Sequence, residues 1–148
     1  MGVTGRNILA FVVGVVVTMS VNMGIIVIGP KIVAPPPGVN PNDPESLKAG
    51  IHLLETKHWM VPLLAHGLGS LVGAFVGALL AASHRLQIAL GIGALHLLGG
   101  ISMRFMIPSP MWFTLFDLVG AYLPMAWLGW KAAESVRPTS APVAAGGP

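Results

Sequence analysis

The stretch "WMVPLLAHGLGSLVGAFVGALLAA", residues 59–82, decides how this chain folds, because it has the length of a membrane span and no Asp, Glu, Lys or Arg. A helix needs about 20 mainly apolar residues to cross the hydrocarbon core of a bilayer. Gly69, Gly73 and Gly77 recur here at intervals of four residues, so they share one helix face. Small residues at this spacing let helix backbones approach closely in lipid. We therefore expect a membrane-spanning helix that packs through this glycine row.

Three further stretches have the length and apolarity of spans, namely 8–29, 86–107 and 111–130. The first is longer than the roughly 7–15-residue apolar core of a secretory signal, so we expect it to remain as a helix. No segment between the spans is long enough for a second domain. The sequence thus predicts an all-α polytopic membrane protein, a four-transmembrane-helix bundle over residues 1–137. The tail, 138–148, has few large apolar residues and is expected to be flexible.

The composition of the whole chain agrees with a protein surrounded by lipid. Of its 148 residues, 54% are hydrophobic and 9% are charged, whereas soluble domains carry about 25% charged residues. The partner that this composition implies is the lipid bilayer. The eight Lys and Arg residues form no cluster, which argues against nucleic acid as a partner. The absence of cysteine excludes disulfides and thiolate metal sites.

The first loop, 30–58, is expected to hold a short helix outside the membrane. Asp43 is a favourable N-cap residue and Pro44 a favourable first residue of a helix. Basic residues near the span ends indicate which side faces the cytoplasm. The side that holds both termini carries Arg6, Arg85, Lys131 and Arg137. We therefore expect both termini in the cytoplasm and the first loop outside.

Each predicted span places one polar residue in the same outer third of the membrane. These residues are Asn22, His66, Arg104 and Asp117, at depths of about 5–10 Å from the outer ends. Ionisable residues inside a membrane normally pair with one another or face a cavity. We expect an ion pair between Arg104 and Asp117, joined by His66 and Asn22 in an outward-facing polar pocket for a small ligand, ion or proton. In a purely structural alternative, Arg104 snorkels to the interface and the others hold the helices together.

Two cofactor alternatives remain beside a pocket without a cofactor. His66 and His96 could ligate a haem, although His96 lies about 6 Å deeper, near the midplane. His52, Glu55 and His58 recur at intervals of three and are weak candidates for a metal site. A single Glu-x-x-His is half of the di-iron carboxylate pattern, and the second half is missing. Neither alternative is the main expectation.

Three segments resemble small four-span bacterial integral membrane proteins of uncharacterised function. They are "NPNDPESLKAG" (40–50), "HLLETKHWMVPLLAHGLGSLVGAFVGA" (52–78) and "PSPMWFTLFDLVGAYLPMAWLG" (108–129). The resemblance implies the fold and a place in the bacterial cytoplasmic (inner) membrane, and it brings no catalytic residues.

Three classes of function follow from these patterns. The first is a binding or transport module built around the polar pocket. The second is an accessory or assembly subunit that uses the glycine row to form a homo-oligomer or to join a larger membrane complex. The third is a membrane enzyme or haem protein. The sequence has no Walker loop, no G-x-S-x-G and no H-E-x-x-H, so it does not favour an enzyme.

Overall fold

The computed structural model describes residues 1–137, and the predicted flexible tail lies outside them. The described chain is helical throughout, with turns and loops between the helices. Its elements are α1 (Val3–Ile32), α2 (Pro44–Ala49), the 3₁₀-helix η1 (Ile51–Leu53), α3 (Thr56–Leu80), α4 (Arg85–Met106), α5 (Met111–Gly120) and α6 (Leu123–Ser135). Four helices are long and apolar enough to cross a membrane: α1, α3, α4 and the pair α5–α6. The structure thus confirms the predicted four-helix membrane bundle.

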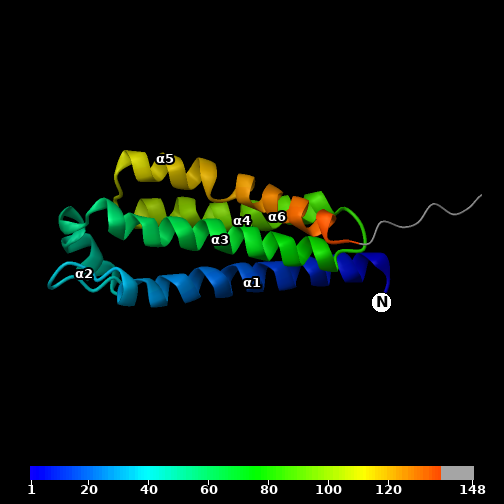
Figure 1. The fold of residues 1–148 in the computed structure, drawn as a ribbon, viewed down its shortest axis with the longest axis horizontal. Coiled ribbons are helices and arrows are strands. Elements are labelled where there is room, and N and C mark those ends of the chain that lie inside the picture. Colours follow the sequence, from blue (N-terminus) through cyan, green and yellow to red (C-terminus); the bar gives the residue numbers. More distant parts are fainter. Residues whose placement is uncertain (138–148) are drawn as a thin grey trace, which may run out of the picture.

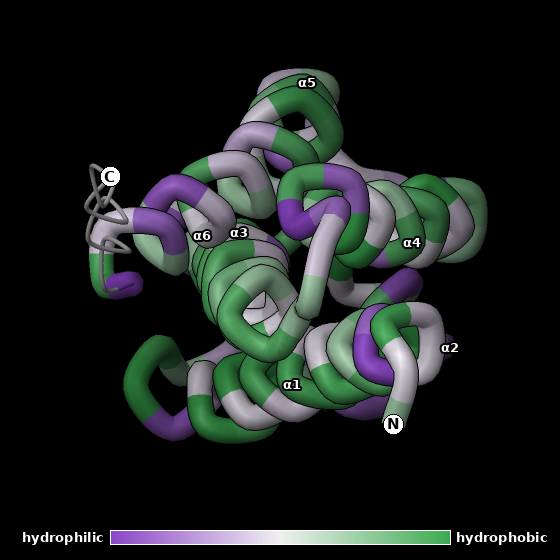
Figure 2. Tube along the Cα trace, turned by 90° about the vertical axis from the view of Figure 1, so that its right-hand side faces the viewer, coloured by the Kyte–Doolittle hydropathy of each residue, from purple (hydrophilic) through white to green (hydrophobic). Residues whose placement is uncertain are grey.

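Helix α3 occupies the middle of the bundle. It packs against α1 on one side and against α4 and α6 on the other, and α4 also contacts α1 and α6 (Figures 1 and 2). The spans run up and down along one long axis. The first loop with α2 lies at one end, and the N-terminus and the end of α6 lie at the other (Figure 1). The central position of α3 explains why its small residues are spread over more than one face.

The glycine row of α3 packs directly on α1. A β-carbon on Gly73 would meet the Thr18 hydroxyl and would lie 2.6 Å from the Gly14 carbonyl oxygen. A β-carbon on Gly69 would lie 3.0 Å from the Thr18 carbonyl oxygen. Gly69, Gly73 and Gly77 are all buried within the chain. The row therefore joins two helices of the same chain.

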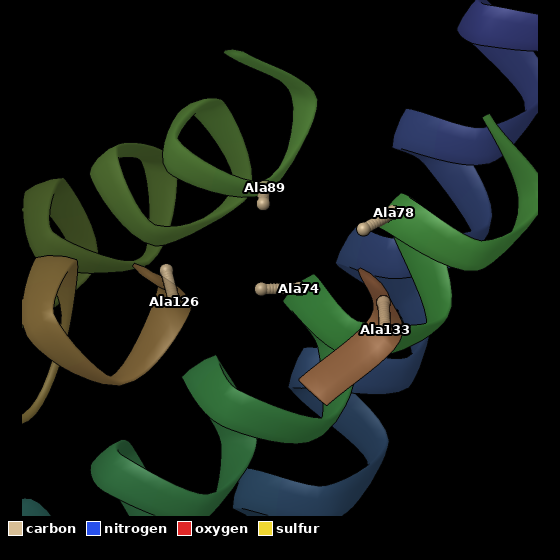
Figure 3. Close-up of a cluster of buried hydrophobic side chains, with 5 residues drawn as sticks. All are labelled: Ala74, Ala78, Ala89, Ala126 and Ala133. Carbon is tan, nitrogen blue, oxygen red and sulfur yellow. The ribbon is translucent and has the colours of Figure 1, made fainter. Parts of the chain in front are cut away.

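A second face of α3 packs against α4 and α6 through alanines, at the end of the bundle opposite the first loop. The buried cluster at this end consists of Ala74, Ala78, Ala89, Ala126 and Ala133, from α3, α4 and α6 (Figure 3). A β-carbon on Gly129 of α6 would lie 2.9 Å from the Phe75 backbone nitrogen, so α6 also approaches α3 at backbone distance. Small side chains thus bring the helices together over the half of the bundle farthest from the first loop.

The fourth span, predicted over 111–130, is interrupted within its length. Helix α5 ends at Gly120, a turn covers Ala121 and Tyr122, and Pro124 lies in the first turn of α6. Proline has no N–H and cannot donate to the carbonyl four residues earlier, here Gly120. The break lets α5 and α6 follow different directions, and α6 approaches α3 more closely than α5 does (Figure 1).

The predicted short helix of the first loop is present as α2. The Asp43 carboxylate accepts a hydrogen bond of 3.2 Å from the Glu45 backbone N–H, and Pro44 is the first residue of the helix. Helix α2 ends at Ala49 because the chain turns at Gly50 into η1. The loop then covers the end of the bundle between α1 and α3 (Figure 1).

Candidate functional site: a cavity at the first-loop end

A cavity of about 380 Å³ lies at the first-loop end of the bundle, between α1, α3, α4 and α5. Residues of the first loop, from Val33 to Leu54, complete its wall. The structure brings together on this cavity the polar residues predicted from four different spans, which are Asn22, His66, Arg104 and Asp117. Most other lining side chains are apolar. The cavity is thus a mainly hydrophobic space into which a few polar groups project.

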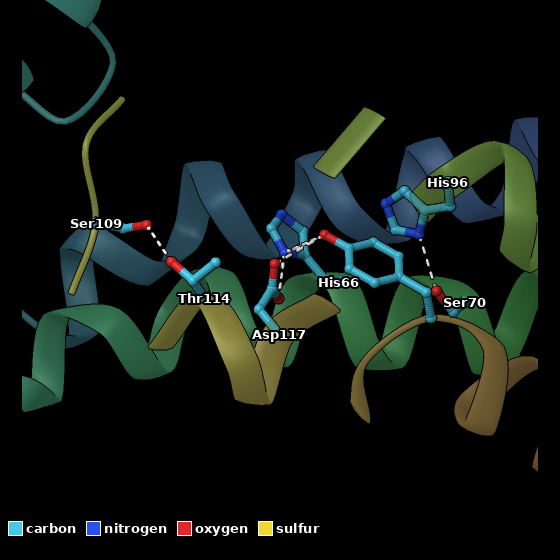
Figure 4. A network of polar contacts seen from close by, with 7 residues as sticks. His66, Ser70, His96, Ser109, Thr114 and Asp117 are labelled. Carbon is cyan, nitrogen blue, oxygen red and sulfur yellow. Dashed lines mark hydrogen bonds and ion pairs between the residues drawn. The ribbon is translucent and has the colours of Figure 1, made fainter. Parts of the chain in front are cut away.

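At the deep end of the cavity, the lining residues His66 and Asp117 form a hydrogen-bonded cluster with the buried Tyr122, and these three residues are here called the floor cluster. His66 Nδ1 lies 2.7 Å from Asp117 Oδ1, and the Tyr122 hydroxyl donates to Asp117 Oδ2 at 2.9 Å (Figure 4). The Tyr122 oxygen also lies 2.8 Å from His66 Nδ1. Asp117 is 4% exposed and Tyr122 is fully buried. Both oxygens of the buried carboxylate therefore have partners, as a buried charge requires.

The predicted ion pair between Arg104 and Asp117 is wrong. Asp117 pairs with His66 instead, and Arg104 has no ion pair or side-chain hydrogen bond within residues 1–137. Tyr122 occupies the place beside Asp117, and Gly100, one helical turn before Arg104 on α4, makes this possible. A β-carbon on Gly100 would meet the Tyr122 hydroxyl, so the missing side chain makes room for this tyrosine. Arg104 follows on the same helix face about 6 Å nearer the first loop.

Tyr122 is the residue that the predicted polar network did not include. The sequence contains one signal that could have placed it there: a tyrosine two residues before a proline inside a predicted span. Discontinuous helices often line membrane binding sites, because the break redirects side chains and frees backbone groups. Here the break directs Tyr122 towards α3 and α4, where it contacts His66 and His96.

The floor cluster sets the tautomer of His66. An ionised carboxylate only accepts hydrogen bonds, so Nδ1 donates to Asp117, and when the ring is neutral Nε2 is an acceptor. Nε2 has no hydrogen-bond partner within residues 1–137 and keeps some exposure, and His66 lines the cavity. This arrangement can accept a hydrogen bond, or a proton, from a molecule in the cavity.

His96 lies beside the floor cluster and is not a lining residue. Its Nδ1 is 2.9 Å from the Ser70 hydroxyl, and its ring meets the His66 ring edge to face at a centroid distance of 5.7 Å (Figure 4). A haem held by both histidines would have to lie between the two rings, each pointing a nitrogen at the iron. The rings are in contact, so this pair does not fit a haem.

His58, one of the three weak candidates for a metal ligand, has a structural role. The His58 ring accepts a hydrogen bond of 2.9 Å from the Glu55 backbone N–H at the start of α3, and its Nε2 lies 3.1 Å from the Ala34 carbonyl oxygen. Within residues 1–137, no group of three His, Asp or Glu side chains could hold a metal ion. His52, Glu55 and His58 therefore do not form a metal site, and His58 ties the first loop to α3.

Asn22 completes the polar side of the cavity from α1. Its Oδ1 is buried and has no hydrogen-bond partner among the described residues. A buried acceptor without a partner costs about 1–3 kcal/mol. Two acceptors near the deep end of the cavity thus lack a donor from the described chain: His66 Nε2, which keeps some exposure, and Asn22 Oδ1, which is buried.

A scan against protein-family models, a search of curated proteins and a search of solved structures each found no match to this chain. The functional argument therefore rests on the geometry of the cavity.

Proposed function

We propose that this protein is a membrane-embedded binding module whose pocket, reached from the first-loop side, takes one small molecule. The observation that supports this most is the convergence of polar residues from four spans on one mainly apolar cavity. Its volume of about 380 Å³ falls near the lower end of the range of about 300–1,000 Å³ found for small-molecule pockets. This size favours a small or single-chain ligand over a two-chain lipid.

The other half of the bundle supports binding at one end over passage through the membrane. Beyond Ser70 and His96, the space between α3, α4 and α6 is filled by the alanine cluster. On the α1 side, the glycine row brings two backbones into contact. A continuous polar path would need further hydrogen-bonding side chains in this half, because an unpaired polar group in an apolar medium is costly.

A cavity-filling substitution tests whether the pocket binds anything. Ile26 lines the cavity one turn nearer the first loop than Asn22, whereas Ile28 is 54% exposed and does not line it. We expect Ile26→Trp to abolish retention of 1-decanoylglycerol, measured by native mass spectrometry of detergent-purified protein. Ile28→Trp is the matched control and should retain the probe like the wild type. Equal retention by all three proteins would exclude the cavity as the binding site.

The location and orientation of the protein are a second part of this proposal. The multi-pass membrane fold is compatible with a bacterial inner membrane, as the sequence resemblance implies. Arg6, Arg85 and Lys131 lie at the end of the bundle opposite the first loop, which supports cytoplasmic termini. The pocket would then open to the outside.

Labelling of single cysteines tests the orientation, since the chain has no cysteine of its own. We expect Asn40→Cys in the first loop to react with an impermeant maleimide in intact cells. Val136→Cys, which is exposed at the end of α6, should react only after the cells are opened. The opposite pattern would place the pocket on the cytoplasmic side.

A further inference from the structure

We propose that the ligand of this pocket is an anionic amphiphile whose carboxylate or phosphate group binds Arg104. This inference rests on the proposed binding function and specifies the chemical class of its ligand. It depends on the distribution of charge over the chain, on the position of Arg104 in the cavity and on the acceptors at the cavity floor.

Each of the five acidic side chains has a partner other than Arg104. Glu45 pairs with Lys48, Glu55 with Lys57, Asp117 with His66, and Glu134 with Arg85, while Asp43 caps α2. The described chain therefore supplies no carboxylate within ion-pair distance of Arg104.

Arg104 also differs from the other basic residues. Arg6 donates to the Leu80 carbonyl, Arg137 to the Leu79 carbonyl, and Lys131 lies over two tryptophan rings. Within residues 1–137, Lys31 and Arg104 are the Lys and Arg side chains that have no such partner. Lys31 is exposed, whereas Arg104 is partly buried and is the Lys or Arg residue that lines the cavity.

The surroundings of Arg104 favour an anion. The cavity that Arg104 lines is also lined by apolar side chains such as Met103, Ile107 and Phe113. A charge-assisted hydrogen bond is stronger in such an apolar setting than in water. A guanidinium group also offers five donors in a planar fork that matches a carboxylate or a phosphate.

The floor of the cavity excludes the anionic group from the deep end. His66 Nε2 and the Asp117 carboxylate are acceptors at this end, and the carboxylate disfavours a second anion. The acidic group therefore belongs at Arg104, about one helical turn nearer the first loop, and the apolar body extends into the cavity. The small, mainly apolar cavity provides room for a single short chain.

Two other roles for Arg104 need no ligand. Its side chain could extend to the membrane surface, or the charge of Asp117 could balance it across the cavity without contact. Both predict that the charge of the head group has no influence on binding. The Asp117 carboxylate already has two hydrogen-bond partners, which leaves it poorly placed to serve Arg104 as well.

The test compares four compounds with similar chains and different head groups by native mass spectrometry. They are decanoate, decyl phosphate, neutral 1-decanoylglycerol and cationic decyltrimethylammonium. We expect the two anions to bind the wild type about 10-fold or more tightly than the neutral compound, which is the range of a charge-assisted hydrogen bond. Arg104→Gln should remove this preference, so that the anions bind this variant no more tightly than 1-decanoylglycerol does, whereas Arg104→Lys should keep part of the preference.

Lys31→Gln is the matched control, because it removes a basic side chain at the same end of the bundle that does not line the cavity. We expect it to have no effect. An equal loss of anion binding in both Gln variants would show attraction to surface charge and would overturn the assignment to Arg104. If Arg104→Gln does not fold, the comparison of anionic with neutral probes on the wild type still decides the head-group charge.

The remaining outcomes separate this inference from the proposed function. Equal binding of anionic and neutral probes would refute the anionic class and leave the pocket intact. No difference between the wild type and Ile26→Trp for any probe would refute both proposals. Inorganic phosphate should not displace decanoate at an equal concentration, because the apolar chain contributes to binding. Displacement would show that the site recognises the free anion and not an amphiphile.

Discussion

The two ends of the bundle are built from the same helices and differ in how the space between them is filled. At the end opposite the first loop, alanines and glycines bring α1, α4 and α6 against α3. At the first-loop end, α5 lies farther from α3 and a cavity of about 380 Å³ separates the helices (Figure 1). The comparison shows that the helices pack closely where their contacts are small residues, and that a cavity remains where larger and polar side chains lie between them.

The boundary between the two ends is a layer of hydrogen-bonded side chains. The floor cluster of His66, Asp117 and Tyr122 lies at the deep end of the cavity, and His96 and Ser70 extend the layer towards the closed half (Figure 4). The break between α5 and α6 falls in the same layer. The fourth span can therefore pack tightly on one side of the break and stand apart on the other.

The largest expected effect comes from disturbing the closed end. In Gly73→Leu, the new side chain would collide with Thr18 and the Gly14 carbonyl, so α1 and α3 would have to separate. We expect a loss of stability of several kcal/mol, or failure to fold, because overpacking against a backbone cannot be relieved by a change of rotamer. Size-exclusion chromatography and thermal unfolding in detergent measure this.

Gly99→Leu is the control for this prediction. Apart from the backbone of its own helix turn, a β-carbon on Gly99 of α4 would have no atom within 4 Å among the described residues, so the same substitution enters open space. We expect a particle size and a melting temperature close to those of the wild type. Similar damage from both variants would show that the closed end does not depend on backbone contact at the glycine row.

A smaller effect is expected at the boundary layer. Asp117→Leu would leave the His66 and Tyr122 hydrogen bonds without an acceptor in a buried site. We expect a loss of about 1–3 kcal/mol, and a smaller loss for Asp117→Asn, which keeps an acceptor oxygen. Equilibrium unfolding in detergent mixtures measures the difference.

Double-mutant cycles then show which partner Asp117 has. The cycle of Asp117→Leu with His66→Leu should give a coupling energy of about 1 kcal/mol or more, as residues in one network do. The cycle with Arg104→Met should give less than about 0.5 kcal/mol, since no ion pair joins these two side chains. The reverse ranking would restore the ion pair expected from the sequence.

The sequence alone was sufficient to predict the four spans and to place the polar residues at similar depths within them. Span length and apolarity follow from the thickness of the hydrocarbon core. Counting from the span ends placed Asn22, His66, Arg104 and Asp117 at similar depths, and the structure finds all of them on one cavity. Depth is a property of one helix at a time, so it can be estimated before the packing is known.

The hydrogen-bond partners could not be predicted in the same way. Which side chain reaches Asp117 depends on how α5 and α6 turn at the break and on the space that Gly100 leaves for Tyr122. Both are consequences of packing between helices. A rule based on opposite charges selected Arg104, whereas the geometry selects a histidine and a tyrosine.

The smallest expected effect concerns the deep end of the cavity, where the described chain leaves two acceptors without donors. A ligand that brings a hydroxyl to the floor should satisfy at least one of them. We expect 10-hydroxydecanoate to bind about 2–10-fold more tightly than decanoate, because one net hydrogen bond contributes about 0.5–1.5 kcal/mol. Asn22→Leu has a similar shape and no acceptor, so it should reduce this advantage.

The same variant should raise the melting temperature of the protein without ligand, because it removes a buried acceptor that has no partner among the described residues. A gain in stability together with a loss of hydroxyl preference would show that the open end keeps Asn22 for its ligand. An unchanged preference in Asn22→Leu and in His66→Leu would show that the ligand does not reach the floor.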